Sequence, residues 1–145
     1  MGKNNRRTGS VAELAVSAKL VSLGYDVSLP FGQSAYDIVA DKDDKLIRIQ
    51  VKSATLSKYG SYRCCLTHGR QSKAKYTQSD CDVVVLYAPY SQDYGDIFMD
   101  GFYVIPIKEL MELNCFHAIL FPSGRGKGNN KICRWERFRD GWESI

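Results

Sequence analysis

The residues best suited to chemistry lie in two extended segments that surround a polar turn. The first segment covers residues 36–41, YDIVAD, and the second covers residues 46–53, LIRIQVKS. Strand alternation places Asp37, Gln50 and Lys52 on one face of this hairpin. A carboxylate, an amide oxygen and an ammonium group on one face can meet one divalent metal ion and one water molecule. This polar face is therefore the candidate active site.

The opposite face of the hairpin is apolar and predicts how the two segments pair. Its expected core residues are Tyr36, Ile38, Ala40, Ile47, Ile49 and Val51. A turn of even length sets Asp37 directly across from Gln50, whereas a slip by one residue would place Asp37 among the isoleucines. Gln50 and Lys52 then lie roughly 7 Å apart along one strand. A hairpin that exposes a polar face for solubility alone fits the same residues and remains an alternative.

A first helix is predicted over residues 10–23, upstream of the hairpin. Ser10 fits its N-cap, Glu13 fits the third residue of a capping box, and Gly24 ends the helix. A capping role would hold the Glu13 carboxylate at the helix terminus. Glu13 therefore has a structural explanation that needs no catalytic role.

The remaining pattern consists mainly of short strands. They are predicted over residues 25–29, 62–66, 82–87, 97–99, 102–105, 118–121 and 132–135, with a second helix over 107–113. The run 82–87 is typical of a buried central strand, the Asp100-Gly101 pair predicts a hairpin turn, and residues 71–77 have weak helical character. The expected fold is α/β with α+β character, a central mixed sheet flanked by helices, in one domain covering residues 1–145.

Composition restricts the class of protein. A hydrophobic content of 44% argues against disorder, and no apolar run reaches membrane-spanning length, so no membrane partner is expected. Five cysteines without C-x-x-C spacing predict free thiols, and the ligand spacing of a zinc site is absent. No apolar segment follows the basic residues near Met1, as a secretory signal would require, so a cytoplasmic location is expected.

The basic residues are more informative in their distribution than in the net charge of +4. They gather in an N-terminal arm, in a central region that also holds tyrosines, and in a glycine-rich loop. The candidate DNA contacts are Arg6, Arg7, Arg63, Arg70, Lys73, Lys75, Arg125 and Lys127. This pattern suits contact with phosphates, although a solvated basic surface fits it equally well.

The order of these features resembles the PD-(D/E)XK nuclease superfamily, with Asp37, Gln50 and Lys52 at the motif positions and Glu13 on the preceding helix. The short sequence segments A-E-L, G-Y-D-V, Y-D-I-V and I-Q-V-K-S within residues 9–53 resemble those of Holliday junction resolvases. They are more similar to those of the group I intron-encoded homing endonucleases that replace the second acid by glutamine.

The resemblance implies a restriction-endonuclease-like core and hydrolysis of double-stranded DNA at specific sites. It implies that Asp37 is the principal metal ligand, that Gln50 is a neutral oxygen ligand and that Lys52 orients or activates water. Glu13 would complete the metal site. Hard oxygen ligands favour Mg²⁺ or Mn²⁺.

Gln50 is the departure from the common family pattern. An amide lacks a full charge, and a unit charge pair at 4 Å is worth about 4 kcal/mol at an effective dielectric of 20. We therefore expect weak metal binding by the free protein and tight binding only when a DNA phosphate completes the coordination.

The expected assembly is at least a dimer, because one chain has one hydrolytic centre and a double-strand break requires two. The family resemblance favours a tetramer. The insert between Lys52 and Asp82 is expected to read the DNA sequence, while Arg125 and Lys127 hold the flanks. The alternatives are a structure-selective junction resolvase, an inactive DNA-binding module of the same fold, and a soluble α/β domain without DNA affinity.

Overall fold

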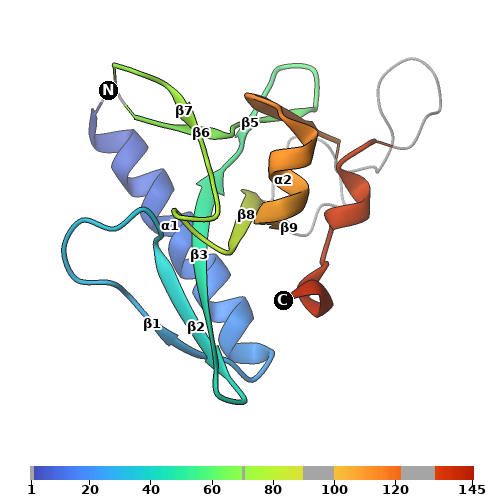
Figure 1. The fold of residues 1–145 in the computed structure, drawn as a ribbon. Helices are drawn as coiled ribbons and strands as arrows, with labels where there is room; N and C mark the ends of the chain where they lie inside the picture. Colours follow the sequence, from blue (N-terminus) through green and yellow to red (C-terminus); the bar gives the residue numbers. More distant parts are fainter. Residues whose placement is uncertain (1, 70, 90–99, 122–132) are drawn as a thin grey trace.

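The computed structural model describes residues 2–69, 71–89, 100–121 and 133–145 (Figure 1). Its centre is a mixed five-stranded sheet in the order β1-β2-β3-β8-β9. Strands β3 and β8 run parallel, and the other neighbouring pairs are antiparallel. The strands are β1 (Asp26–Ser28), β2 (Ile38–Lys42), β3 (Lys45–Ser53), β8 (Val83–Ala88) and β9 (Gly101–Pro106). The predicted central mixed sheet is confirmed, and all six residues of β8 are buried.

Helix α1 (Gly2–Ser22) covers one face of this sheet and runs behind β2 and β3 in Figure 1. Its buried residues Ala12, Val16 and Leu20 share one apolar cluster with the sheet residues that face it. Gly24 ends the helix as predicted, at a φ of 88°. The amide of Tyr25 donates to the Leu20 carbonyl at 3.1 Å, which is the bond expected where a left-handed residue terminates a helix.

The other face of the sheet is covered by shorter elements around a second apolar cluster. A three-stranded sheet contains β4 (Thr55–Leu56), β5 (Tyr62–Cys65) and β10 (His117–Leu120). A two-stranded hairpin contains β6 (Thr67–His68) and β7 (Ala74–Lys75). The helical segments are α2 (Ile107–Leu113), η2 (Glu136–Phe138) and η3 (Trp142–Ser144). The predicted second helix, the strand before Leu66 and the strand after Phe116 therefore all exist.

The β2–β3 hairpin has the predicted register. Ile38 pairs with Ile49 and Lys42 with Lys45, so the same register places Asp37 opposite Gln50. The two turn residues, Asp43 and Asp44, both have positive φ, which matches the twist of the strands they join. The predicted even turn is confirmed.

The start of α1 differs from the prediction. The helix already contains residues 2–9, so Ser10 is an interior residue and not its N-cap. The Ser10 hydroxyl donates to the Arg6 carbonyl at 3.0 Å, a bond made by serines inside helices. The Ser-x-x-Glu spacing misled because residues three apart also neighbour each other within a helix, and no proline precedes Ser10 to stop it. Glu13 therefore has no capping role.

Tyr36 was expected on the same face of the hairpin as Ile38, and this prediction is wrong. Its ring packs against the opposite cluster and lies 5.9 Å from the Arg48 guanidinium. Pairing within β2 begins at Ile38, so strand alternation does not extend back to Tyr36.

Two local predictions also fail, and a third depends on residues outside the described part of the chain. Residues 71–77 contain β7 and no helix, because this segment pairs with β6 and buries Tyr76. Gly101 lies in β9 and pairs with Ala88 of β8, while the strand 97–99 on the other side of the predicted hairpin lies outside the described residues. In place of the predicted strand 132–135, residues 134–135 form a turn that leads into η2, and the Trp135 and Phe138 rings lie 6.2 Å apart in a tilted arrangement; residue 132 lies outside the described residues.

Other general expectations can be compared directly. All five cysteines are free thiols, as predicted. None of the helices in the described part of the chain has the length and apolar character needed to cross a membrane. Trp135, Phe138 and Trp142 are buried, so the aromatic C-terminal segment belongs to the core.

The parallel pair β3–β8 is tied together at its start by Arg48 and Asp82. The Asp82 carboxylate accepts hydrogen bonds from the Arg48 backbone amide at 2.8 Å and from its Nη2 at 2.9 Å. Arg48 also donates to the carbonyls of Gln78 and Ser79. The hydrogen bonds from Arg48 hold the pKa of Asp82 below its usual value.

We predict that Asp82→Ala lowers the free energy of unfolding by about 1 kcal/mol at neutral pH, because it removes charge-assisted bonds at a partly exposed site. A depressed pKa stabilises the fold above the unfolded-state pKa of about 3.9 and loses that effect as pH falls through the folded-state value. Urea unfolding at neutral pH and at a pH below the folded-state pKa of Asp82 tests this, with Glu112→Ala as the control. An equal loss at low and neutral pH would contradict the assignment.

Candidate active site

Asp37 lies where β2 separates from β3, and its side chain completes the pairing at that point. The Asp37 amide donates to the Ile49 carbonyl, and its Oδ2 accepts a hydrogen bond from the Val51 amide, each at 2.9 Å. A carboxylate oxygen thus takes the place of a backbone acceptor. Because Oδ2 is held by the backbone of β3, Oδ1 remains the oxygen with freedom to bind another group.

Gln50 and Lys52 lie on β3 next to this carboxylate, and both are half-buried. Gln50 is opposite Asp37, and its Nε2 donates to the Val51 carbonyl at 3.2 Å. That bond leaves the amide oxygen Oε1 as the group available to a cation. The Lys52 ammonium donates to the Thr67 carbonyl at 3.1 Å and lies 5.3 Å from the centre of the Tyr76 ring.

Glu13 reaches the same region from α1. It is half-buried, and burial raises its pKa, followed by repulsion from the Asp37 carboxylate. Burial also raises the pKa of Asp37, while the Val51 amide and the Lys52 charge act in the opposite direction. These mutual effects place the charges of Glu13, Asp37 and Lys52 in one neighbourhood. The structure therefore brings together the residues that the sequence predicted from three separate segments.

The donor set fits a hard divalent cation. Two carboxylates that repel each other in a partly buried site are relieved by a bound positive charge, and the Gln50 amide adds a neutral oxygen. No three His, Cys, Asp or Glu side chains gather around one point among the described residues. A cation held here would accordingly rely on Glu13, Asp37 and Gln50, with further ligands from outside the protein.

The basic residues predicted to contact DNA differ in exposure within the described part of the chain. Arg6, Arg7, Arg63 and Lys73 are exposed. Lys75 is half-buried, and its ammonium donates to the Asn114 side chain and lies 4.2 Å from the Phe116 ring centre. That ammonium is thus already used inside the protein. Arg70, Arg125 and Lys127 lie outside the described residues.

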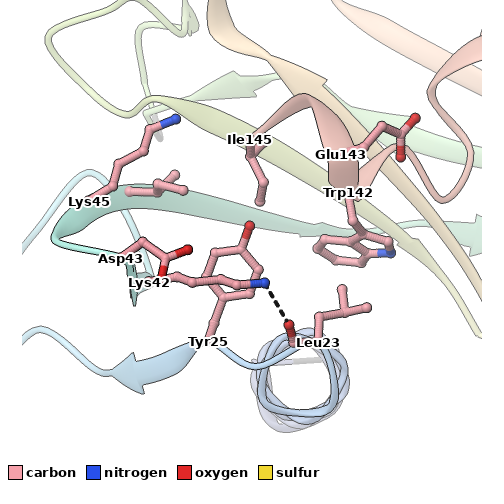
Figure 2. A pocket seen from close by; sticks show the side chains of 9 residues that line it. Leu23, Tyr25, Lys42, Asp43, Lys45, Trp142, Glu143 and Ile145 are labelled. Atoms are coloured by element: carbon pink, nitrogen blue, oxygen red, sulfur yellow. Dashed lines mark hydrogen bonds between the residues drawn. The ribbon is translucent and has the colours of Figure 1, made fainter.

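A pocket of about 450 Å³ lies at the other end of β2, beside the turn of the hairpin (Figure 2). Lys42 crosses it, donates to the Leu23 carbonyl at 3.0 Å and lies 4.9 Å from the Tyr25 ring centre. Trp142 and Ile145 form the opposite wall. None of Glu13, Asp37, Gln50 and Lys52 lines this pocket, so we do not assign the site to it.

Two residues that contact Lys52 were not predicted as site residues. Thr67 contributes its backbone carbonyl, which no side-chain pattern could reveal. Tyr76 is one of the tyrosines in the central basic region, and the sequence predicted no catalytic or positioning role for it. The signal that could have identified it is its place at the end of a basic segment that must fold back toward β3.

Comparison with known proteins identifies the family and the fold of the chain. Residues 3–139 match the PD-(D/E)XK endonuclease family. A bacterial homing endonuclease, I-Ssp6803I, has a similar structure with a TM-score of 0.79, covering 97% of this chain and 91% of that chain at 24% sequence identity. A search of curated proteins finds no match.

The structural likeness confirms the expected restriction-endonuclease-like fold, and the family match extends over nearly the whole chain, including Glu13, Asp37, Gln50 and Lys52. This chain belongs to the PD-(D/E)XK endonuclease family.

Proposed function

We propose that the protein is a metal-dependent, site-specific DNA endonuclease that makes double-strand breaks, and that it acts as an intron homing endonuclease. The observation that carries the proposal is the convergence of Asp37, Gln50 and Lys52 with Glu13 of α1. The likeness to a bacterial homing endonuclease supports the homing role. The free cysteines support a reducing compartment, and we place the enzyme in the cytoplasm.

In this proposal each residue has a distinct role in hydrolysis. Glu13, Asp37 and Gln50 would hold Mg²⁺ or Mn²⁺, which supplies charge neutralisation at the phosphate and a more acidic bound water. Lys52 would orient the attacking water with its ammonium. The water oxygen would bond to phosphorus and give up a proton to solvent as the bond to the 3′-oxygen breaks, and the leaving 3′-oxygen would take up a proton from solvent, which leaves a 5′-phosphate and a 3′-hydroxyl. Arg6, Arg7, Arg63 and Lys73 would contact double-stranded DNA.

We predict that Asp37→Asn and Lys52→Ala each reduce cleavage by at least about 100-fold, since each removes a group needed in the transition state. Plasmid pools of random sequence incubated with Mg²⁺ provide the assay. The controls are Asp41→Asn and Lys45→Ala, which remove the same charges from exposed positions of the same two strands.

The pKa values of Glu13 and Asp37 are raised, so both carboxyls gain protons at a higher pH than usual. The cleavage rate should therefore begin to fall on acidification at a pH above the usual carboxyl pKa of about 4.

Three outcomes would contradict this function. Cleavage of four-way junctions without cleavage of long linear sites would indicate a junction resolvase. Salt-dependent DNA binding without cleavage would indicate an inactive DNA-binding module. Cleavage that survives in both the Asp37 and the Lys52 variants would place the active site elsewhere.

The charge of the ligand set predicts weak metal binding by the free protein. Calorimetry without DNA should detect no micromolar Mg²⁺ binding by the parent, because Gln50 contributes no charge. Gln50→Glu should increase the affinity of the free protein for Mg²⁺ by at least about tenfold, well below the upper limit that a full charge pair allows. Gln78→Glu, which adds the same charge at an exposed position, is the control. Micromolar binding by the DNA-free parent would refute the prediction.

We also propose that the enzyme assembles at least as a dimer, and we favour a tetramer. One chain offers one candidate centre, and two strands must be cut. Helix α1 supports the proposal, because its outer face carries Val11, Leu14 and Val21, which are 48%, 66% and 58% exposed, together with exposed Ala18. A solvated helix face normally carries charged residues, yet the only charges between Ser10 and Ser22 are on Glu13 and Lys19, which lie off this stripe.

The stripe is symmetric about residue 16. In an antiparallel pair of α1 helices, Leu14 of each copy would meet Ala18 of the other, and Val11 would meet Val21. Arg7, on the same face, would lie beside the negative end of the partner helix. We expect Leu14→Glu to reduce the mass measured by light scattering in the absence of DNA. Met111→Glu, at an exposed apolar residue of α2, should leave the mass unchanged. An unchanged mass for Leu14→Glu would exclude α1 as the contact.

A further inference from the structure

The Lys52 ammonium contacts the β6–β7 hairpin and does not form an ion pair with the neighbouring Asp37 carboxylate. Its Nζ donates to the Thr67 carbonyl at 3.1 Å and lies 5.3 Å from the centre of the Tyr76 ring. No ion pair within 4.0 Å joins Lys52 to an acidic group in the described part of the chain. Its charge still acts on Asp37 and lowers the pKa of that carboxyl, which burial raises overall.

Both contact groups come from the two ends of the same hairpin. Thr67 is the first residue of β6 and pairs with Lys75, and Tyr76 directly follows β7. Thr67 and Tyr76 are only 5% and 4% exposed. Both groups are therefore packed inside the protein at the base of the hairpin.

The hairpin itself stabilises the Tyr76 ring. The His68 ring lies 4.8 Å from the Tyr76 ring, and His68 Nε2 is 3.6 Å from the Asp80 carboxylate. Further from the core, the hairpin turns at Gly69, which has a φ of 93°. Gln71, Ser72 and Lys73 after this turn are exposed. One end of the hairpin therefore faces outward with a cationic residue, and the other end contacts Lys52.

We propose that Tyr76 is a positioning residue for Lys52, and that contact between the β6–β7 hairpin and a DNA backbone moves Lys52 into its working place. The inference rests on the proposed nuclease function. Displacement of the hairpin by a phosphate contact near Lys73 shifts the Thr67 carbonyl and the Tyr76 ring together. The ammonium, which both groups hold, moves with them toward Asp37. Binding at the hairpin is thereby coupled to hydrolysis at β3.

The first test measures single-turnover cleavage at saturating DNA by Tyr76→Leu and Tyr76→Phe. Tyr76→Leu should lower the cleavage rate by about tenfold, the scale of a desolvated cation–π contact, with little change in DNA affinity. Tyr76→Phe keeps the ring and should restore the rate. Tyr103→Leu removes another buried tyrosine from the same apolar cluster, and the folded variant should cleave DNA at the parental rate. A parental rate for Tyr76→Leu, or equal losses for the Leu and Phe variants, overturns the role of the ring.

The second test does not require cleavage. In the free parent, NMR should show the Lys52 ε-methylene signals displaced by the Tyr76 ring current, and Tyr76→Leu should abolish that displacement. Saturating duplex DNA in Ca²⁺ should change these signals in the parent. Signals that stay unchanged with DNA bound overturn the coupling. A parent that cuts no DNA refutes the proposed function alone, because the free-protein signals still report whether Tyr76 holds Lys52.

Discussion

The hydrogen bond between the Asp37 carboxylate and the Val51 amide is the constraint on which the candidate site depends. It closes the β2–β3 ladder at the point where the chain departs from the sheet, and it uses one carboxylate oxygen to do so. The same bond sets the position of Asp37 relative to Gln50 and Lys52, because Gln50 and Lys52 lie on β3 and the bond fixes Asp37 to the β3 backbone. A carboxylate held in this way has little freedom to turn away, so the proposed metal ligand would already be in place before any ligand binds.

The candidate site lowers the stability of the folded state at neutral pH. Glu13 and Asp37 both have raised pKa values, with burial as the main cause, so ionisation of these carboxyls at neutral pH opposes the folded state. The stability they would add as neutral acids is present below their unfolded-state pKa values and is lost as pH rises. Elsewhere the molecule offsets this: β8 is fully buried between β3 and β9, and α1 adds Ala12, Val16 and Leu20 to the core. Carboxyl pKa values raised in this way cluster at functional sites.

Much of this arrangement could be predicted because it follows from local rules. Alternation in residues 46–53 and an even turn determine the register that places Asp37 opposite Gln50. The β-branched run in β8 similarly requires burial. Local rules failed where tertiary contacts decide the outcome. Ser10 and Glu13 have capping-box spacing inside a longer helix, Tyr36 leaves the alternation of β2, and residues 74–75 form a strand because β6 is available to pair with them. The Thr67 carbonyl that holds Lys52 lies beyond any side-chain pattern.

The most direct measurement of the central claim is a crystal structure of the protein bound to target DNA with Mn²⁺, located by its anomalous scattering. The account predicts an ion coordinated by Asp37 Oδ1 and the Gln50 amide oxygen, with Glu13 and a phosphate oxygen completing the site, while Asp37 Oδ2 still accepts the Val51 amide. An ion bound without Asp37, or an Asp37 carboxylate released from β3 in the complex, would contradict it.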